Sequence, residues 1–429
     1  MSIEELYKAF SKNNRVCTDS RKLQAGDIFF ALKGPNFDGN KFAIKAIEQG
    51  AILSVADDQS LKGENDIIIV EDALRTLQTL ALFHRKKLGT KIIAITGSNG
   101  KTTTKELLAG VLSKKFNTYA TKGNLNNHIG VPLSLLELNS DNELAVIEMG
   151  ANHAGEIASY CEFTDPDLGL ITNIAAAHLE GFGDINGVLK AKSELFEYLN
   201  KRERTFFLNS DDERLKDKWA TNKNICSFGT SNTNDSTATL VVDGVFVGIE
   251  WTFDKKNYKA ISNLTGMYNF SNLLASLCVA KYFEIDDEAI ADAFEEYKPS
   301  NMRSQVTMTK HNTVVMDAYN ANPSSMKVAL ENMQRSFAQN IVLILGDMNE
   351  LGILSDKFHN EILEAALAID PQKIFLVGKR FKTAQNEKVL TMDNVDQLIE
   401  HIKQNKISGS NILVKGSRTV GLEGVMEVL

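Results

Sequence analysis

Short apolar runs alternate with longer helical stretches through the middle of the chain. From Lys91 onward the runs are "KIIAIT", "ELAVIEMG" and "DLGLITNIA", and a helix is expected over residues 102–115. Strands that alternate with helices in this way are expected to be parallel, with the helices between them as crossovers. The pattern therefore predicts a parallel sheet with crossover helices.

The two ends of the chain show related patterns in separate units. The first 88 residues hold the apolar runs "DIFFALKG" and "DIIIV" with helical stretches between them, which predicts a small α/β unit. A third unit begins near residue 300 and contains the strands "TVVMDAY", "IVLILGDM", "KIFLVGK" and "NILVKGS". Each of these strands runs into Gly, Asp, Asn or Lys, and ligands bind at the carboxyl ends of strands in open α/β sheets.

Residues 222–262 have a different, β-rich pattern. The run "ATLVVDGVFVGIEWTF" contains Asp243-Gly244, a dipeptide typical of hairpin turns. We interpret it as a β excursion that ends the middle domain. A chain of 429 residues is too long for one core, and the division expected from these patterns is three α/β domains, residues 1–88, 89–300 and 301–429.

Composition narrows the class of protein. Lys+Arg 47 against Asp+Glu 55 gives a net charge of −8, which argues against a surface that coats nucleic acid. The four cysteines are far apart in the chain and form no C-x-x-C pair, so buried free thiols are expected. The start, "MSIEELYKAFSKNN", lacks the apolar core of a signal peptide, and no apolar run reaches the roughly 18 residues of a membrane span. A cytoplasmic location is expected.

The stretch "IIAITGSNGKTTTKELLAGVL", residues 92–112, reads as strand, Gly-rich turn and helix. It resembles the phosphate-binding loop G-x-x-x-x-G-K-[ST], but Gly97 lies only three residues before Gly100 and Ile95 takes the place of the outer glycine. Backbone N–H groups and the helix N-terminus would point at one anion. Lys101 adds a full charge, and the Thr102 hydroxyl can bind Mg²⁺. The stretch predicts phosphate binding, while the shortened loop leaves the type of enzyme open.

Three other residues could complete such a site. Glu148 ends the strand "LAVIEMG", one βα unit after the loop, where its carboxylate could reach the metal that Thr102 reaches. His178 in "NIAAAHLEGFG" and Lys192 on the next helix could belong to a two-metal site. From the residues alone, however, such a histidine more often forms local hydrogen bonds and such a lysine is more often solvated.

Polar residues also gather at the entrance to the third unit. The segments "SNMRSQ" and "VVMDAYNANPSS" place Arg303, Asp317, Asn320 and Asn322 there. Arg303 could contact a γ-phosphate across a domain cleft, because a guanidinium favours phosphate, and Asp317 suits a ribose hydroxyl pair. Interdomain packing is the alternative role for these residues.

Taken in order, these motifs resemble those of the Mur ligases, ATP-dependent enzymes that extend the peptide of cell-wall precursors. The resemblance runs from about residue 15 to the C-terminus, and its motifs are "TGSNGKTT", "GNLNNHIGVPLSLL", "VIEMGANHAGEI", "TNIAAAHLEGFG", "KAKSELF", "GMYNFSNLLA", "DAYNANPSSM", "LGDMNELG" and "VKGSR". "DAYNANP" and "GDMNELG" fit best the branch that adds D-alanyl-D-alanine to UDP-N-acetylmuramoyl-tripeptide. The resemblance implies a central P-loop parallel-sheet ATPase domain between an N-terminal α/β UDP-binding domain and a C-terminal Rossmann-like domain.

The resemblance also implies roles for the candidate residues, with ATP and Mg²⁺ as cofactors. Glu148 would hold the first metal, and His178 and a carbamylated Lys192, in "AKSE", would hold the second. The ATP phosphates would lie on the shortened loop, which is the family's own form: Gly97, Ser98, Asn99, Gly100, Lys101, Thr102 and Thr103. At least one of Asn269 and Asn272 would line the adenosine site, next to Tyr268 where the family usually has histidine, and Arg303 and Asp317 would serve the γ-phosphate and ribose.

The remaining expected contacts concern the two substrates. The UDP part would meet Ser20, Arg21, Lys33 and Asp38; the muramoyl-peptide would meet Asn126 and Asn127. Asp347, Asn349 and Glu350 would face the dipeptide, with Asn320 and Asn322 also on the substrate side. A monomer is expected, and the third domain would swing to complete the site.

Two alternatives stay open at this point. One is another amino-acid-adding relative, such as a diaminopimelate- or lysine-adding ligase or a folylpolyglutamate synthase, although the chain has no D-N-P-R motif like that of the diamino-acid-adding member. The other is a non-catalytic protein that binds muramoyl-peptides or nucleotide.

Overall fold

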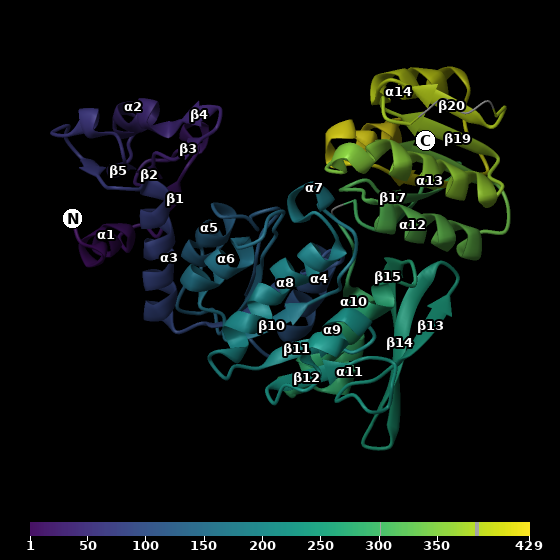
Figure 1. Cartoon of the computed structure of the whole chain (residues 1–429), viewed down its shortest axis with the longest axis horizontal. Helices are drawn as coiled ribbons and strands as arrows, with labels where there is room; N and C mark the ends of the chain where they lie inside the picture. The colour runs from purple at the N-terminus through teal and green to yellow at the C-terminus, as the bar shows by residue number, and fades with distance from the viewer. Residues whose placement is uncertain (301, 382–385) are drawn as a thin grey trace.

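The computed structural model describes residues 1–300, 302–381 and 386–429. It is an α/β protein of three domains that follow one another along the chain (Figure 1). The N-terminal domain lies apart from the C-terminal domain, and the central domain lies between them. No helix within the described ranges is both long and apolar enough to cross a membrane.

The N-terminal domain is a small parallel sheet with strand order β1-β2-β5-β6. Its strands and the adjoining hairpin are β1 (Val16–Cys17), β2 (Ile28–Phe30), β3 (Lys33–Gly34), β4 (Phe37–Asp38), β5 (Leu53–Ala56) and β6 (Ile67–Ile69). Its helices are α1 (Ile3–Phe10), α2 (Ala43–Glu48) and α3 (Ala73–Leu88). Helix α3 begins at the Asp72 cap, ends at the left-handed Gly89 and packs on α1 and on the central domain. The expected small α/β unit is present.

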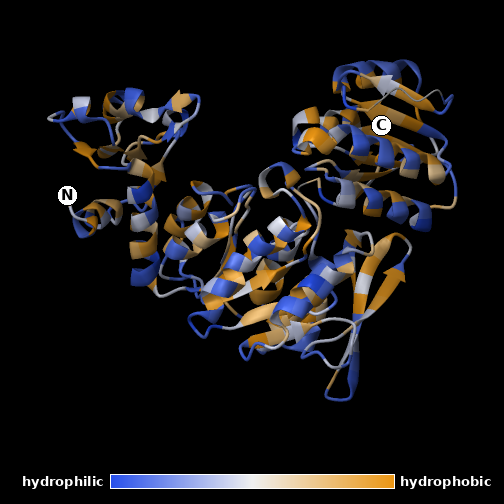
Figure 2. Ribbon diagram, viewed as in Figure 1, coloured by the Kyte–Doolittle hydropathy of each residue, from blue (hydrophilic) through white to orange (hydrophobic). Residues whose placement is uncertain are grey.

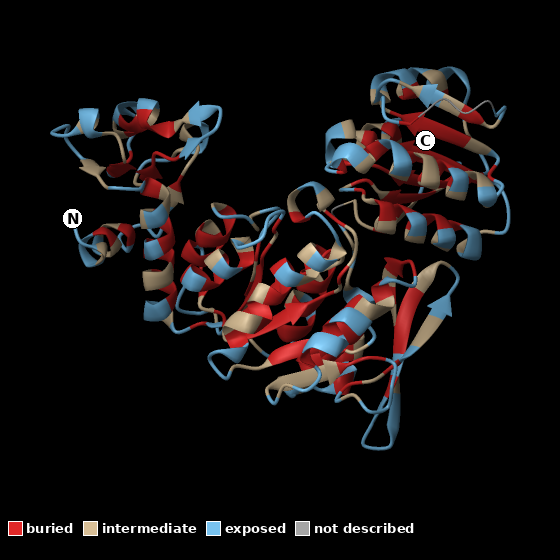
Figure 3. Cartoon of the chain, in the orientation of Figure 1, coloured by how far each residue is buried: buried red, intermediate tan, exposed pale blue. Residues whose placement is uncertain are grey.

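The central sheet has six parallel strands in the order β12-β11-β10-β7-β9-β8. They are β7 (Lys91–Thr96), β8 (Thr118–Ala120), β9 (Leu144–Glu148), β10 (Leu168–Ile171), β11 (Phe206–Asn209) and β12 (Ile225–Phe228). Successive side chains of a strand point to opposite faces, so Ile92 and Ala94 enter one core while Ile93 and Ile95 enter the other. Burial on both faces explains the continuous apolar runs of the sequence (Figures 2 and 3).

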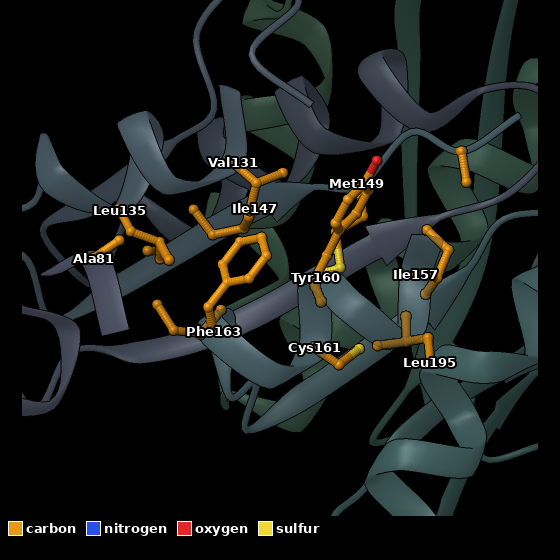
Figure 4. Packing of buried hydrophobic residues seen from close by; sticks show 14 of the residues in the cluster. Ala81, Val131, Leu135, Ile147, Met149, Ile157, Tyr160, Cys161, Phe163 and Leu195 are labelled. Atoms are coloured by element: carbon orange, nitrogen blue, oxygen red, sulfur yellow. The ribbon is translucent and has the colours of Figure 1, made fainter. Parts of the chain in front are cut away.

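Two layers of helices cover this sheet. One core holds α4 (Lys101–Leu112), α10 (Asn269–Tyr282) and α11 (Asp287–Glu296); the other holds α3, α5 (Gly130–Leu136), α6 (Glu156–Thr164) and α8 (Ile185–Asn200). Figure 4 shows the second core, where Tyr160 and Phe163 of α6 pack beside Ile147 of β9 and Leu135 of α5. The short helices α7 (Leu179–Phe182) and α9 (Glu213–Trp219) complete the domain. The helix expected over 102–115 is α4, one residue earlier at its start and three shorter at its end.

The β excursion is shorter than the sequence pattern suggests. It is an antiparallel sheet of β13 (Thr239–Asp243), β14 (Phe246–Phe253) and β15 (Lys256–Thr265), and its first turn has Gly244 at φ +58° as expected. Assigning the whole of 222–262 to it is wrong, because β12 is the sixth strand of the central sheet. Only Phe228 of β12 is fully buried, since an edge strand has one neighbour, and so no long apolar run identifies it.

The C-terminal domain is a Rossmann-like sheet with strand order β16-β17-β21-β18-β19-β20, in which only β16 is antiparallel. The four predicted strands are β17 (Thr313–Asp317), β18 (Ile341–Gly346), β19 (Lys373–Val377) and β21 (Asn411–Lys415). The edge strands β16 (Gln305–Met308) and β20 (Val389–Met392) were not predicted. The helices are α12 (Pro323–Ser336), α13 (Ser355–Ala368) and α14 (Val395–Gln404).

The strand order places the carboxyl end of β7 at a switch point. Strands β8 and β9 lie on one side of β7, and β10, β11 and β12 lie on the other. The segments that follow β7, β9 and β10 therefore diverge and leave a crevice at the carboxyl ends of these strands. Ligands bind in crevices of this kind in open α/β sheets.

A candidate phosphate-handling cleft

The loop between β7 and α4 requires its two glycines. Gly97 has φ +142°, and a Cβ atom there would lie 2.0 Å from Oγ1 of Thr172. Gly100 has φ +79°, and a Cβ there would lie 2.5 Å from Oδ1 of Asn272. Both values are too close for real contacts, so only glycine fits at either position. The loop therefore packs closely against Thr172, the residue after β10, on one side and against Asn272 of α10 on the other.

Lys101 starts α4 and turns back over this loop. Its Nζ donates hydrogen bonds to the carbonyl oxygens of Gly97 (2.8 Å) and Ser98 (3.1 Å). Burial lowers the pKa of the Lys101 ammonium, with Glu148 opposing the shift and Arg303 adding to it. A lysine at the N-terminus of a helix that follows a glycine-rich turn is an arrangement suited to phosphate.

Glu148, at the end of β9, is buried beside this loop with both carboxylate oxygens engaged. Oε2 accepts from the Thr102 hydroxyl (2.9 Å), and Oε1 accepts from Nδ2 of Asn126 (2.8 Å). The backbone N–H of Glu148 donates to Thr121 (3.0 Å). These contacts confirm that Glu148 and Thr102 lie together. The family resemblance assigns Asn126 to the muramoyl-peptide, but in the structure Asn126 contacts Glu148, so its contact with substrate stays a prediction.

These oxygen donors suit a magnesium ion. Mg²⁺ is bound by one or two carboxylates together with substrate phosphates and water, and Thr102 and Glu148 offer a hydroxyl and a carboxylate. Among the described residues there is no group of three or more His, Cys, Asp or Glu side chains that could hold a metal ion without such help. A metal here would need oxygens from a bound ligand.

Lys192, on α8, is buried, although a solvated lysine was the expectation from the residues alone. Its Nζ donates to the carbonyl oxygen of Ala151 (2.8 Å) and lies 5.0 Å from the centre of the Phe182 ring. Burial, and next the charge of Lys101, lower the pKa of Lys192 to about 7. A substantial fraction of this amine is therefore neutral near pH 7, which is the form that reacts with carbon dioxide.

His178 joins the central domain to the C-terminal domain. It adopts the left-handed conformation (φ +52°) at the start of α7, and its Nδ1 lies 2.5 Å from Oε2 of Glu350. The contact with His178 lowers the pKa of Glu350. His178 lines the cleft, whereas Glu350 lies beside His178 and is not part of the lining.

The opposite wall of the cleft comes from the C-terminal domain. The Arg303 guanidinium lies 3.6 Å from the centre of the Tyr319 ring, and its buried Nε makes no hydrogen bond within the part of the chain that the structure describes. Nζ of Lys415 lies 2.5 Å from Oδ2 of Asp317. Lys415 lines the cleft but was not among the predicted site residues; a lysine at the carboxyl end of the buried strand "NILVK" is the signal that could have found it.

Ser304 connects the two walls. It is buried with φ +50°, and its hydroxyl lies 2.5 Å from the Tyr268 hydroxyl of the central domain. Its backbone N–H donates to Oδ1 of Asp317 (3.2 Å) in the C-terminal domain. Asn322 makes a second bridge, because its Nδ2 donates to Oδ1 of Asn99 in the glycine loop (2.8 Å).

The cleft between these walls has a volume of about 800 Å³. Asn269 and Asn272 lie at its base, both buried, and Nδ2 of Asn272 donates to Oδ1 of Asn269 (2.8 Å). Asn127 and the exposed Asn320 also line it. The structure thus brings these predicted residues to one cleft: Ser98, Asn99, Gly100, Lys101, Thr102, Thr103, Asn126, Asn127, Glu148, His178, Asn269, Asn272, Arg303, Asp317, Asn320 and Asn322. Gly97 and Lys192 adjoin this lining through Lys101 and Ala151.

The other predicted residues do not line this cleft. On the N-terminal domain, Ser20 and Arg21 lie in the 3-10 turn Ser20–Lys22, where Arg21 pairs with Asp19 (2.8 Å). Lys33 pairs with Asp57 (2.8 Å).

Three more of these residues make local contacts. Oδ1 of Asp38 accepts from the N–H of Asn40 (3.1 Å). Asp347 accepts from backbone N–H groups of residues 379 and 380, and Nδ2 of Asn349 donates to the Thr419 hydroxyl (2.7 Å). Their ligand contacts stay predictions.

The fold and the cleft define a three-domain α/β protein with a glycine-rich strand-to-helix loop at a domain junction. Family profiles match all three parts: "Mur ligase family, catalytic domain" at residues 14–85, "Mur ligase middle domain" at 95–280 and "Mur ligase, glutamate ligase domain" at 302–418. The UDP-N-acetylmuramoyl-tripeptide–D-alanyl-D-alanine ligase of Bacillus subtilis (strain 168) is 34% identical over 96% of this chain and 92% of its own length. The chain belongs to the Mur ligase family.

Solved structures show the same likeness. A crystal structure of MurF from Acinetobacter baumannii covers 99% of this chain, with 98% of that chain matched, a TM-score of 0.88 and 29% identity. The MurF ligase from Thermotoga maritima in complex with ADP covers 96% of each chain, with a TM-score of 0.86 and 28% identity. The fold expected from the sequence is therefore confirmed.

Proposed function

We propose that this chain is an ATP- and Mg²⁺-dependent ligase that joins D-alanyl-D-alanine to UDP-N-acetylmuramoyl-tripeptide in peptidoglycan precursor synthesis. The observation that supports it most directly is the glycine loop with Lys101, Thr102 and the buried Glu148 at one end of a cleft shared with Arg303. Full-length similarity to relatives of that name supports the substrate assignment.

The reaction has two steps. The terminal carboxylate of the tripeptide attacks the γ-phosphorus of ATP, which forms an acyl phosphate and releases ADP. The amine of D-alanyl-D-alanine then attacks the acyl carbon, so that a peptide bond forms, phosphate leaves with the electrons of the C–O bond, and the amine loses a proton. Both steps bring anions or dipoles together, so the main work of the protein is positioning and charge compensation.

Lys101 and Arg303 supply the two cations. Lys101 already lies on the loop carbonyls, and a γ-phosphate that enters the loop offers it a stronger, charged partner. The Arg303 Nε has no partner of its own among the described residues, and a phosphate oxygen would satisfy it. Asn269, Asn272 and Asp317 would line the adenosine and ribose.

Thr102 and Glu148 would hold one Mg²⁺, and His178 and a carbamate on Lys192 would hold a second. Bound metal would offset the crowded phosphate charge. The carbamate fits the buried amine, because carbamylation turns a buried cation into the anionic oxygen ligand that Mg²⁺ prefers.

Several finer points belong to the same proposal. Ser20, Arg21, Lys33 and Asp38 would meet the UDP part; Asn126 and Asn127 the muramoyl-peptide; Asp347, Asn349 and Glu350 the dipeptide; and Asn320 and Asn322 would also contact substrate. The domain boundaries at 88 and 300, a monomeric state, a cytoplasmic location and closure of the third domain also stay predictions.

A phosphate-release assay tests the proposal. Protein, ATP, Mg²⁺ and UDP-N-acetylmuramoyl-tripeptide are incubated with one amine at a time: D-alanyl-D-alanine, diaminopimelate, lysine or glutamate. Release with D-alanyl-D-alanine is expected, with product confirmed by mass. Release with another amine only would assign the chain to another adding ligase, and tight binding of the nucleotide without ADP formation would support a non-catalytic binding protein.

A further inference from the structure

Two of the four cysteines lie in contact, far from each other in the sequence. Sγ of Cys226, on β12, is 3.4 Å from Sγ of Cys278, on α10. Cys17 makes a different contact, a hydrogen bond from its thiol to the Asp19 carbonyl (3.1 Å). Burial was expected for all four cysteines and holds for Cys17, Cys161 and Cys278, whereas Cys226 is half-buried; the close pair also has a chemistry that single buried thiols lack.

The two thiols of the pair differ in access and in acidity. Cys226 is half-buried on the edge strand of the central sheet, whereas Cys278 is completely buried on α10. A hydrogen bond from Cys278 lowers the pKa of Cys226, although burial opposes this shift. The contact with Cys226, together with burial, raises the pKa of Cys278. The more reachable sulfur is therefore the better nucleophile.

We propose that Cys226 and Cys278 form a reversible dithiol–disulfide site that reacts with small disulfides. The Cys226 thiolate attacks one sulfur of the small disulfide, forms a mixed disulfide and releases the other half as a thiolate. Cys278 then loses its proton to that thiolate and attacks the Cys226 sulfur. The second half leaves as a thiolate, so the protein dithiol is oxidised and the small disulfide is reduced to two thiol equivalents.

The geometry favours closure inside one chain. A disulfide needs its sulfur atoms about 2.05 Å apart, so the present 3.4 Å must shorten by only about 1.3 Å. Among the described cysteines, Cys226 is the one whose sulfur contacts the buried Cys278. A mixed disulfide on Cys226 therefore has its resolving thiol directly beside it.

Closure would act on the nucleotide loop through α10. Asn272 lies six residues before Cys278, about 9 Å along the helix axis. Its Oδ1 accepts from the Thr104 hydroxyl of α4 (3.1 Å) and lies where a side chain at Gly100 would collide. A covalent link between β12 and α10 restrains the helix that presses on this loop, so we expect the oxidised protein to turn over nucleotide more slowly. The expected loss of activity rests on the proposed function, whereas the dithiol chemistry does not.

Peptide mapping tests the chemistry without any activity. The full chain is incubated with oxidised glutathione, quenched by acid and analysed by mass spectrometry. Wild type should lose two hydrogen atoms and yield a linked peptide pair containing Cys226 and Cys278. Cys278→Ala should instead accumulate one glutathionyl group on Cys226, and Cys226→Ala should stay unmodified at Cys278.

Other results of that experiment would overturn the proposal. These are failure of wild type to form the link at millimolar oxidised glutathione, glutathionyl addition at Cys278 in Cys226→Ala, and preferential modification of Cys17 or Cys161. Thermal unfolding checks each variant. If the buried Cys278→Ala variant is unfolded, the Cys226→Ala variant, changed at a half-buried edge position, still decides whether Cys278 reacts alone.

Phosphate release measures the consequence. Oxidised wild type should lose activity on the order of fivefold and recover it with dithiothreitol, while Cys226→Ala should not respond to the oxidant. Formation of the link with unchanged activity would overturn the coupling to the nucleotide loop. If reduced protein releases no phosphate with any amine, the proposed function fails, but the dithiol chemistry is still decided by the peptide map.

Discussion

The central domain holds its predicted ligand-facing groups in a buried network, whereas the N-terminal domain holds the predicted ligand groups Arg21 and Lys33 nearer the surface. Glu148 is buried and both its carboxylate oxygens accept hydrogen bonds, from Thr102 and Asn126. In the N-terminal domain, by contrast, Arg21 is exposed and pairs with Asp19, and Lys33 is half-exposed in its pair with Asp57. The two regions would meet opposite ends of the same precursor.

The difference follows from what each region would do. Groups that act on the reacting phosphate must be oriented before the substrate arrives, because reorientation during the reaction adds to the barrier. Groups that only retain the precursor can stay solvated and exchange a local partner for a ligand oxygen at small cost. Substitutions should therefore affect kcat strongly in the central network and KM weakly in the N-terminal domain.

The largest expected effect is that of Lys101→Ala. The ammonium that covers the glycine loop is lost, so turnover should fall on the order of 10³-fold, as measured by ADP and phosphate release. Lys114→Ala is the matched control, since Lys114 lies on the surface just beyond the same helix and pairs with Glu296. Near-normal turnover of Lys101→Ala would refute the role of the loop.

Lys192→Ala should be nearly as damaging. Without the amine no carbamate can form, so the chain should be inactive, and a small carboxylic acid added to the buffer should restore part of the activity. Lys190→Ala, an exposed lysine on the same helix, should remain active. Full activity of Lys192→Ala without any additive would show that the carbamate is dispensable.

The pH dependence of carbamylation follows from the same amine. The pKa of Lys192 is lowered to about 7, so the neutral fraction rises as the pH increases through 7 and is nearly complete well above it. At constant dissolved ¹³CO₂, the carbamate signal in ¹³C NMR should therefore rise between about pH 6 and pH 8. Without the shift, the rise would lie at higher pH, because a smaller fraction of the amine would be neutral at each pH.

The comparison also explains how far sequence reasoning reaches. The strands β7, β9 and β10, the loop and Glu148 were predictable because burial on both faces produces apolar runs and because the loop chemistry is compressed into seven adjacent residues. The edge strands β12, β16 and β20 escaped, since they are only partly buried and carry no continuous apolar run. The short edge strand β8 and the fully buried β11 of the central sheet were not predicted either.

Contacts across the fold were harder to foresee. Nothing local in "AKSE" shows that Lys192 is buried against Ala151, and the resemblance alone pointed to it. Lys415 meets Asp317 only because β21 pairs with β17, although the two residues are separated by 98 positions. Spatial neighbours of this kind depend on strand order, which periodicity does not specify.

Intermediate effects should come from the contact that joins the two walls of the cleft. Tyr268→Phe leaves the buried Ser304 hydroxyl without its 2.5 Å partner, so kcat/KM for ATP should fall about tenfold through poorer placement of Arg303. Tyr282→Phe is the control, because the exposed Tyr282 lies at the far end of the helix that follows Tyr268 and contacts only the rings of Phe207 and Phe283 among the described aromatic residues.

A double-mutant cycle sharpens this expectation. If Tyr268 and Ser304 act through their mutual hydrogen bond, the loss in Tyr268→Phe/Ser304→Ala should be clearly smaller than the sum of the two single losses on a free-energy scale. Strictly additive losses would show that the two hydroxyls act independently. An effect on stability alone, with kcat/KM unchanged, would remove the positioning role.

The smallest effect should be that of Lys33→Ala in the N-terminal domain. Its ion pair with Asp57 is half-exposed, so the midpoint of urea denaturation should stay close to that of the wild type. KM for the UDP-linked precursor should rise about two- to fivefold while kcat and the KM for ATP stay unchanged, because a contact equal in ground and transition states affects binding only. Lys62→Ala, an exposed lysine of the same domain, should change neither constant. A large fall in kcat for Lys33→Ala would mean that the N-terminal domain takes part in orienting the reacting groups, and the contrast between the two regions would then be one of location and not of role.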